Sequence, residues 1–418
     1  MRSEANRPTT SDYHVHRPLV LRTPVGNLRL LSKPGIYSWD RLDSGAAMLL
    51  RALREDGLPP GTRLLDLGCG NGCIGLALLH LQPELSLHLA DASHAAYTAV
   101  SLSIEKLGYP AKAWLSDIAI DLPQEQRFDV VVSNLPRGRL LAEQFLREAW
   151  HRLEPGGRLY IGGARDTGIL TRISTMEEWF GKVDKMGAAA GYRVARAIRT
   201  AGRPAPPTSD YHEWREATFE ARDRSWRCVT KPGVFSWQHL DEGTERLLES
   251  LAVRKGNRLL DLGCGAGQVG LVAASLAEGV SVVMVDDSLP AVRASERTAA
   301  INGVAATVLL SDSASAVIGE HFDVVATNPP FHLGPGVEHE TAGQFIEDAR
   351  DVLDGKGRLF LVCNAFIPYE KQMAAMFRRV EPAYQGKRYK VLLGARPVGR
   401  CKHREKPPIV AMQQERPT

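Results

Sequence analysis

Short, continuous runs of apolar residues alternate with amphipathic stretches along most of this chain. In the second half, the apolar runs predict strands at Arg258–Leu262, 280–285, Ala306–Leu310, Phe322–Thr327 and 358–362. Between and after these runs, the residue pattern predicts helices at 267–276, 289–302, 344–353 and 369–379, and an edge strand at 389–394. Because the predicted strands are apolar on both faces, they indicate a mostly parallel sheet with helices on both sides.

The pattern of the first half recurs in the second half. Ser11-Asp12-Tyr13-His14 returns as Ser209-Asp210-Tyr211-His212, and the segment 64–70 returns at 259–265. A repeat of roughly half the chain is far too long for a solenoid, so it predicts two whole α/β domains. The resulting division is a disordered segment at 1–10, a first domain at 11–200, a Pro-rich linker at 201–208, a second domain at 209–400 and a basic tail at 401–418.

A glycine-rich segment follows the first predicted strand of the second domain. It reads Asp261-Leu262-Gly263-Cys264-Gly265-Ala266-Gly267, and Asp286 ends the next predicted strand. Glycines at this place let the backbone approach a ligand, and a carboxylate at that spacing suits a ribose diol. Gln268 stands where the dinucleotide-binding pattern requires a glycine, so the loop favours S-adenosylmethionine (SAM) over a dinucleotide. In the SAM-binding pattern Asp261 lies near the methionine ammonium, and Asp312 after the third strand meets the adenine amino group.

Asn328-Pro329-Pro330-Phe331 follows the fourth predicted strand of the second domain. The prolines end the strand, so the Asn328 carboxamide projects from its carboxyl end, where ligands bind in open α/β sheets. An Asn oxygen and a neighbouring carbonyl can accept both hydrogens of a planar amino group while Phe331 stacks on the ring behind it. A strand followed by a Pro-rich turn is the alternative for this tetrapeptide alone, but the upstream loop and acids favour a methyltransferase.

With these motifs the chain resembles the RsmC/RlmG-type ribosomal RNA guanine-N2 methyltransferases, which are tandem methyltransferase-fold proteins. The resemblance is most specific at 232–236, at 240–244, in the glycine loop and at Asn328–Phe331. It implies two tandem Rossmann-like SAM-dependent methyltransferase domains and methyl transfer from SAM to the exocyclic N2 amine of a guanine in ribosomal RNA. It also implies that Asp241, Gly243 and Thr244 lie near the cofactor, although the same segment reads as a helix start.

The predicted site therefore lies in the second domain. Its predicted catalytic residues are Asn328, Pro329, Pro330 and Phe331. We expect the methyl group to pass directly, in line, from SAM to the amine without a covalent enzyme intermediate. Its cofactor-binding residues are Asp241, Gly243, Thr244, Asp261, Gly263, Cys264, Gly265, Gly267, Asp286 and Asp312.

The first domain keeps only part of this pattern. A candidate vestigial cofactor site consists of Asp66, Gly68, Gly70, Gly72 and Asp91. The segment that matches the catalytic tetrapeptide is Asn134-Leu135-Pro136-Arg137, which lacks the aromatic residue and the first proline. We therefore predict that the first domain is a non-catalytic scaffold or RNA-binding domain.

Charge and composition are consistent with an RNA substrate. The 418-residue chain has a formal net charge of +4 and a pI of about 8.7, which permits a nucleic-acid partner without requiring one. Basic residues dominate between Lys387 and Arg416, as in a phosphate-binding surface or a solvated basic tail. No apolar run approaches the roughly 18 residues of a membrane span, and the cysteines show no zinc-ligand spacing. We expect a cytoplasmic monomer without membrane or metal partners that acts on ribosomal RNA or a ribosomal subunit.

Three other functions fit the same motifs. A protein-glutamine N5 methyltransferase uses the same amino-group chemistry, but that family favours Tyr where Phe331 stands. An adenine-N6 methyltransferase is chemically close. A non-catalytic ribosome-assembly factor with two relict cofactor folds is a third alternative, against which the intact motifs of the second domain argue.

Overall fold

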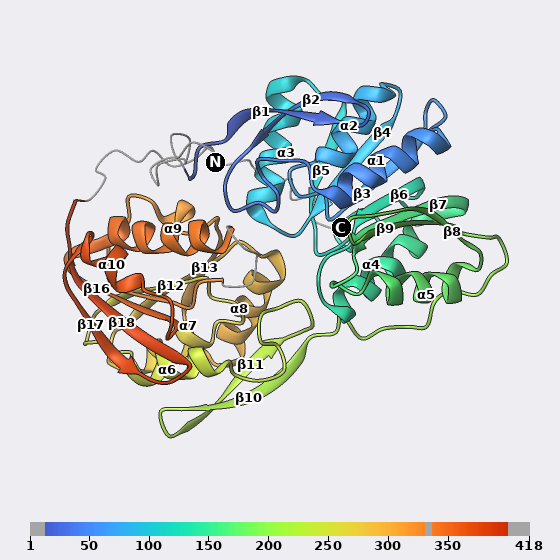
Figure 1. Ribbon diagram of the computed structural model, residues 1–418. Helices are drawn as coiled ribbons and strands as arrows, with labels where there is room; N and C mark the ends of the chain where they lie inside the picture. Colours follow the sequence, from blue (N-terminus) through green and yellow to red (C-terminus); the bar gives the residue numbers. More distant parts are fainter. Residues whose placement is uncertain (1–12, 331–336, 400–418) are drawn as a thin grey trace. The chain divides into compact units, whose positions relative to one another are not determined.

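The computed structural model of the chain describes residues 13–330 and 337–399 (Figure 1). These residues form two compact units, one from Val15 to Glu213 and one that begins at Trp214 and also includes Tyr13 and His14. Among the described residues, each unit contains one seven-stranded sheet and a separate two-stranded hairpin. The prediction of two tandem, mostly parallel α/β domains is confirmed.

The first unit opens with the hairpin β1 (Arg17–Thr23) and β2 (Gly26–Ser32). Its helices are α1 (Ser44–Asp56), α2 (Cys73–Leu81), α3 (His94–Leu107), α4 (Arg139–Arg152) and α5 (Ile169–Phe180). Its sheet strands are β3 (Arg63–Leu67), β4 (Ser86–Asp91), β5 (Ala111–Leu115), β6 (Phe128–Asn134), β7 (Leu153–Ala164), β8 (Val183–Ala189) and β9 (Tyr192–Ile198). They pair in the order β5-β4-β3-β6-β7-β9-β8, with β9 antiparallel to both of its neighbours.

The second unit repeats this order. It opens with the hairpin β10 (Arg215–Ala221) and β11 (Arg224–Thr230). Its helices are α6 (Glu242–Ser250), α7 (Gln268–Ser275), α8 (Leu289–Ile301), the 3-10 turn η3 (Ser315–Val317), α9 (Val337–Val352) and α10 (Tyr369–Ala374). Its sheet strands are β12 (Arg258–Leu262), β13 (Ser281–Asp286), β14 (Ala306–Leu310), β15 (Phe322–Thr327), β16 (Leu353–Asn364), β17 (Phe377–Gln385) and β18 (Tyr389–Pro397). They pair in the order β14-β13-β12-β15-β16-β18-β17.

Strand β12 shows why the apolar runs are continuous. Leu259 packs in the core that contains residues of α6 and α7, whereas Leu260 and Leu262 pack in the core that contains residues of α9 and α10. Figure 1 shows these two pairs of helices on opposite faces of the sheet. Since successive side chains of a strand point to opposite faces, both faces of β12 must be apolar.

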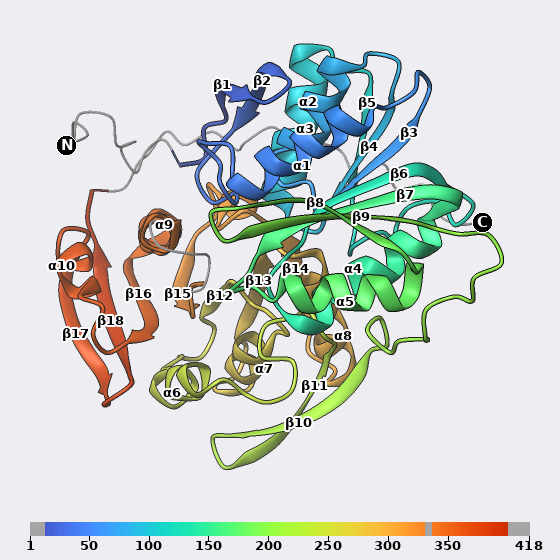
Figure 2. The ribbon, with the colours of Figure 1, turned by 45° about the vertical axis from the view of Figure 1, so that its right-hand side comes forward.

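Two predictions at the C-terminal edge of this sheet are wrong. The predicted helix at 369–379 ends at Ala374, and Phe377 begins β17. The strand predicted at 389–394 is not at the edge, because β18 lies between β16 and β17 (Figure 2). Strand β17 contains Pro382, which has no N–H to donate and is therefore tolerated at an edge beside a register shift. Its charged, largely exposed sequence resembles a surface helix more than a buried strand.

The unit boundaries also differ from the predicted domains. Tyr13 and His14 belong to the second unit rather than the first, and Tyr211 and His212 belong to the first rather than the second. The reason is that His14 contacts Asp312 and Asp348 of the second unit, whereas His212 contacts Glu148 of the first unit. The predicted disordered segment at 1–10 and the basic tail at 401–418 lie outside the described residues. In the part of the chain that is described, no helix is long and apolar enough to cross a membrane.

Candidate functional site

The glycine loop joins β12 to α7 and turns on three left-handed residues. Gly263, Gly265 and Gly267 have φ angles of 79°, 56° and 79°, a conformation that residues with a Cβ rarely adopt. A Cβ at Gly267 would lie 3.2 Å from the Ser295 Cα, whereas a Cβ at Gly265 would meet no heavy atom within 4 Å. Gly267 is thus required by packing as well as by conformation, while the space beside Gly265 is open to a ligand.

Asp286 holds the loop from the end of β13. Its Oδ2 accepts from the Gly265 N–H at 2.9 Å, and its Oδ1 accepts from the Ser288 N–H at 2.9 Å. Burial raises the pKa of Asp286, while these backbone donors act in the opposite direction. The two oxygens carry four lone pairs, and the backbone N–H groups of Gly265, Asp287 and Ser288 occupy three of them, so Asp286 can accept a further hydrogen bond from a ribose hydroxyl.

Asp261 is more deeply placed than Asp286. Only 2 % of the residue is exposed, and its Oδ2 accepts from the Gly270 N–H in the first turn of α7 at 2.8 Å. Burial raises the pKa of Asp261 to about 7. This hydrogen bond connects the end of β12 to α7. A contact between Asp261 and the methionine ammonium of SAM stays a prediction.

Cys264 serves the packing of the loop. Its buried thiol lies 3.2 Å from the Ser295 hydroxyl, and burial raises its pKa well above the ordinary value. Its N–H donates to the Val285 carbonyl at 3.0 Å. The side chain is therefore occupied within the protein core.

The carboxamide of Asn328 is anchored from one side. Its Nδ2 donates to Asp241 Oδ2 at 3.1 Å and to Thr244 Oγ1 at 3.0 Å. An ionised carboxylate only accepts, so the amide nitrogen must face Asp241 and Oδ1 remains available as an acceptor. Asn328 directly follows β15, whose Thr327 pairs with Leu262 of β12. The Oδ1 acceptor therefore belongs to a residue beside the glycine loop.

Asp241 is both the N-cap of α6 and the anchor of Asn328. Its Oδ2 accepts from the Thr244 N–H at 2.9 Å, which is the helix-start geometry that the sequence left as an alternative. Gly243 is required here, because a Cβ would lie 2.9 Å from the Asp241 carboxylate and 3.2 Å from the Tyr389 ring. The helix-start interpretation is confirmed, and the position of this segment near the cofactor stays a prediction.

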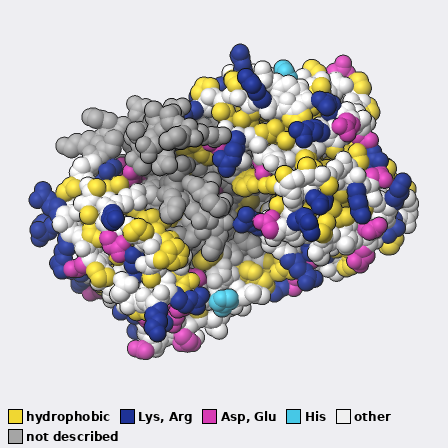
Figure 3. All heavy atoms as spheres, viewed as in Figure 1, with side chains coloured by type: hydrophobic (Ala, Val, Ile, Leu, Met, Phe, Trp, Pro, Cys, Tyr) yellow, Lys and Arg dark blue, Asp and Glu magenta, His cyan; other side chains and the backbone are white. Residues whose placement is uncertain are grey.

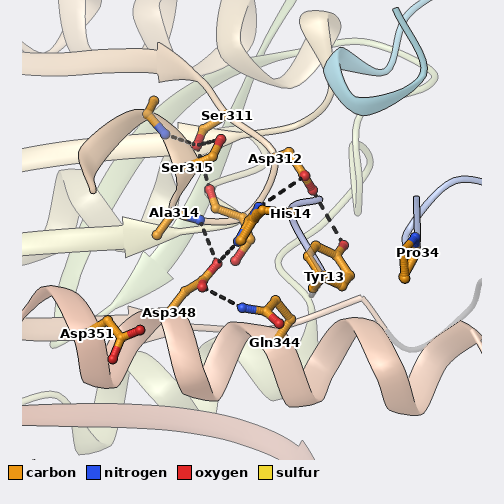
Figure 4. A network of polar contacts seen from close by, with 12 residues as sticks. Tyr13, His14, Pro34, Ser311, Asp312, Ala314, Ser315, Gln344, Asp348 and Asp351 are labelled. Carbon is orange, nitrogen blue, oxygen red and sulfur yellow. Dashed lines mark hydrogen bonds and ion pairs between the residues drawn. The ribbon is translucent and has the colours of Figure 1, made fainter. Parts of the chain in front are cut away.

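Asp312 lies after β14 in a separate polar network (Figure 4). Ser311 joins this loop to β13, because its N–H donates to the Asp286 carbonyl at 2.8 Å. His14 Nδ1 lies 3.4 Å from Asp312 Oδ2, and the Tyr13 hydroxyl lies 3.4 Å from Asp312 Oδ1. Tyr13 and His14 were not among the predicted site residues, although their motif recurs in the sequence.

The remaining predicted residues are only partly described. Pro329 is buried and Pro330 is exposed, while Phe331 lies outside the described residues. Phe366, which the motifs did not identify, is 83 % exposed and follows β16, the strand next to β15. No cluster of three or more His, Cys, Asp or Glu side chains within residues 13–330 and 337–399 could hold a metal ion.

The first unit reproduces most of this geometry. Asn134 Nδ2 donates to Asp43 Oδ2 at 2.9 Å, and Asp43 caps α1 as Asp241 caps α6. Asp91 accepts from the Gly70 N–H at 2.9 Å, and Asp66 Oδ2 accepts from the Gly75 N–H at 2.8 Å. Gly68, Gly70 and Gly72 are left-handed, with φ angles of 73°, 55° and 78°. The unit thus retains the loop and the anchored Asn, but Leu135 and Arg137 replace the first proline and the aromatic residue.

The residues present fit an adenosyl cofactor. The open space beside Gly265 lies next to Asp286, whose two oxygens are fixed by backbone donors. Asp312 supplies a third, partly exposed carboxylate on the loop after the neighbouring strand β14. Left-handed glycines and the carboxylates of Asp286 and Asp312 therefore lie at the carboxyl ends of β12, β13 and β14, where ligands bind in open α/β sheets.

Comparison with known proteins adds three findings. A family model described as the methyltransferase small domain matches residues 27–196 and 225–393. A ribosomal RNA small subunit methyltransferase C from Hahella chejuensis is 32 % identical over 342 residues, covering 81 % of this chain and 95 % of that protein. One from Aeromonas hydrophila is 33 % identical over 267 residues, covering 64 % and 77 %. Among solved structures, the 16S rRNA N2 G1207 methyltransferase (RsmC) of T. thermophilus, in complex with AdoMet and guanosine, matches with a TM-score of 0.79 and 29 % identity, covering 93 % of this chain and 100 % of that one.

Proposed function

We propose, from the premise that the chain belongs to the ribosomal RNA small subunit methyltransferase C family, that it transfers a methyl group from SAM to the N2 amine of a guanine in small-subunit ribosomal RNA. The resemblance drawn from the sequence is confirmed at the level of the family. The T. thermophilus relative is named for G1207 of 16S rRNA, and we take the corresponding guanine as the proposed target.

The observation that carries the proposal is the orientation of Asn328. Asp241 and Thr244 hold its amide nitrogen, so its Oδ1 faces away from them at the end of β15. A guanine amino group has two hydrogens to donate and no acceptor, which suits an anchored carboxamide oxygen and the adjacent Pro329 carbonyl. The same pair of acceptors would disfavour a carbonyl or a ring nitrogen at this place.

The proposed chemistry is positioning together with electrostatics. The guanine amino nitrogen is a weak nucleophile because its lone pair is delocalised into the ring. Acceptance of both hydrogens by Asn328 Oδ1 and the Pro329 carbonyl favours a pyramidal nitrogen with an available lone pair and stabilises the positive charge that develops on it. When bound, SAM would supply the electrophilic methyl group and be left as S-adenosylhomocysteine, while the methylated nitrogen loses one proton to solvent. Asp286 would hold its ribose and Asp312 its adenine amino group.

The RNA-binding surface is proposed to include basic residues outside this site. On the face shown in Figure 3, Lys and Arg side chains lie among acidic and apolar ones. Arg388 is exposed but paired with Glu242 at 2.6 Å. Lys390, which the sequence included among the basic residues of the C-terminal segment, is buried and paired with Glu370 at 2.5 Å, so it is unsuited to phosphate contact. The basic residues from Arg400 onward lie outside the described residues.

The first unit is proposed to be a scaffold or RNA-binding domain without methyl transfer of its own. Its anchored Asn134 is an acceptor comparable with Asn328, but Arg137 cannot provide the same stacking surface as an aromatic ring. Attachment of a second domain raises the effective concentration of a second RNA contact. A monomeric, cytoplasmic protein remains a prediction.

The proposal is tested with the whole chain, labelled SAM and small ribosomal subunits that lack the modification. The parent should modify a guanine at N2, and mapping the product distinguishes this from adenine or protein modification. Asn328→Ala should lower kcat by about a hundredfold or more with little change in SAM affinity, because the contact forms with the reacting nitrogen. Asn134→Ala is the matched control and should keep kcat. A kcat for Asn328→Ala within tenfold of the parent would remove Asn328 from the mechanism.

A further inference from the structure

A buried histidine joins the second unit to the start of the chain. His14 Nε2 lies 2.9 Å from Asp348 Oδ2 on α9, and His14 Nδ1 lies 3.4 Å from Asp312 Oδ2 (Figure 4). The His14 and Asp348 side chains are 12 % and 1 % exposed. Gln344 holds the other oxygen of Asp348 at 2.6 Å. His14 thus lies between one fixed carboxylate and the carboxylate of Asp312.

Tyr13 completes the contact with Asp312. Its hydroxyl lies 3.4 Å from Asp312 Oδ1, so Tyr13 and His14 together reach both oxygens of this carboxylate. The Tyr13 and His14 rings meet edge to face at 5.1 Å, and Tyr13 is 5 % exposed. Contacts to both oxygens fix the plane of this carboxylate.

The first unit contains the same arrangement with the other copy of the motif. His212 Nε2 lies 3.1 Å from Glu148 Oε1 on α4, and His212 Nδ1 lies 3.7 Å from Asp117 Oδ2. Asp117 follows β5 as Asp312 follows β14. Each histidine therefore lies beside the acid that follows the third sheet strand of the unit that it does not begin. In both units a histidine thus lies between a helix carboxylate and the acid that follows the third sheet strand, and the helix carboxylate is Asp348 in one unit and Glu148 in the other.

We propose that His14 is a positioning residue for cofactor binding: together with Tyr13 it orients Asp312 so that its carboxylate accepts the adenine amino group of SAM. This inference rests on the proposed function. It assigns to Tyr13 and His14 a part of the cofactor site in the second unit. Residues after Trp214 would then lack a complete adenine pocket without Tyr13 and His14.

The test compares two ligands that differ at the adenine amino group. S-adenosylhomocysteine carries this group, whereas S-inosylhomocysteine carries a carbonyl oxygen at C6 and a hydrogen on N1, so it has no donor at the position of the amino group. Calorimetry on the full-length parent should show tighter binding of the adenosyl ligand. His14→Ala should weaken its binding roughly tenfold and leave the inosyl ligand nearly unchanged, so that the preference collapses. KM for SAM should rise while kcat at saturating SAM is kept.

Matched variants separate positioning from folding. His212→Ala removes the equivalent histidine of the first unit and should keep both the preference and KM. His14→Gln keeps an N–H donor and should restore part of the affinity, which also serves if His14→Ala folds poorly. The effects of His14→Ala and Asp312→Ala should be non-additive, since both act on one contact.

Two results would overturn the inference. If His14→Ala lowers the unfolding temperature but keeps the preference for the adenosyl ligand, His14 only stabilises the fold of the unit. If Asp312→Ala also keeps the preference, Asp312 is not the adenine acceptor. A parent that binds neither ligand would instead contradict the proposed function itself.

Discussion

At the scale of single residues, the two units differ less in polar chemistry than in aromatic surface. Asn328 and Asn134 are anchored by equivalent N-cap carboxylates, so the hydrogen-bond acceptor is present in both units. The aromatic positions are not shared. Arg137 stands in the place of Phe331, and Asp166 follows β7 where Phe366 follows β16. Loss of aromatic residues beside an intact acceptor is what we expect when a domain no longer binds a base.

Phe366 is therefore expected to contact the RNA. An 83 % exposed aromatic side chain contributes little to the core, but it can stack on a base beside β15. Phe366→Ala should raise KM for the ribosomal substrate by about five- to a hundredfold, since stacking on one base contributes ~1–3 kcal/mol. SAM affinity and the unfolding temperature should stay near those of the parent.

The matched control for this prediction is Asp166→Ala in the first unit. It changes the equivalent exposed position without removing an aromatic ring, and its KM should equal that of the parent. An unchanged KM for Phe366→Ala at matched salt would show that this ring is not part of the RNA contact.

At the scale of elements, the two glycine loops allow the stability cost of a left-handed residue to be measured separately from the loss of a ligand contact. Gly265 and Gly70 have φ angles of 56° and 55°, and neither has an atom within 4 Å of the place a Cβ would take. Alanine at either position should cost about 1–2 kcal/mol of stability for the left-handed conformation. The two positions differ only in the unit to which the loop belongs.

Gly265→Ala should therefore weaken SAM binding and turnover, whereas Gly70→Ala should affect stability alone. The physical reason is that a methyl group at Gly265 would enter the open space beside Asp286. This is the place where we propose that the cofactor lies against the backbone of the loop. Denaturant unfolding and KM for SAM measured on both variants check this. Equal losses of turnover in the two variants would show that the first loop also serves the reaction.

At the scale of the whole molecule, the Tyr-His motifs tie each unit to a distant part of the sequence. His14 and Asp348 are separated by 334 residues in the chain. Burial alone would lower the pKa of His14, but the carboxylates of Asp348 and Asp312 overcome this effect and raise it from 6.5 to about 9. His14 is accordingly protonated at neutral pH and donates from both ring nitrogens.

The stability of the protein should depend on this charge. Since the folded-state pKa of His14 exceeds its unfolded value, the stabilisation is fully present below pH 6.5 and is lost as the pH rises through about 9. Compared with His14→Gln, the parent should unfold at a higher temperature at pH 6, and the difference should shrink towards pH 10. Melting curves of the two proteins in parallel check this, because other titrating groups are common to both. A difference that does not change with pH would mean that the pKa of His14 is the same in the folded and the unfolded protein.

The sequence by itself determined the duplication, the α/β class, the glycine loop and the position of the Asn-Pro-Pro-Phe tetrapeptide after a buried strand. These features are local, because strands buried on both faces need continuous apolar runs and left-handed turns need glycine. Only the tertiary structure decided which side chains meet. Asp241 orients Asn328 from 87 residues away, and His14 reaches Asp312 in the unit that it does not begin. The edge position of β17 likewise follows from pairing with β18 rather than from its own charged sequence. Contacts between distant residues depend on the packing of whole elements, and no short pattern in the chain encodes them.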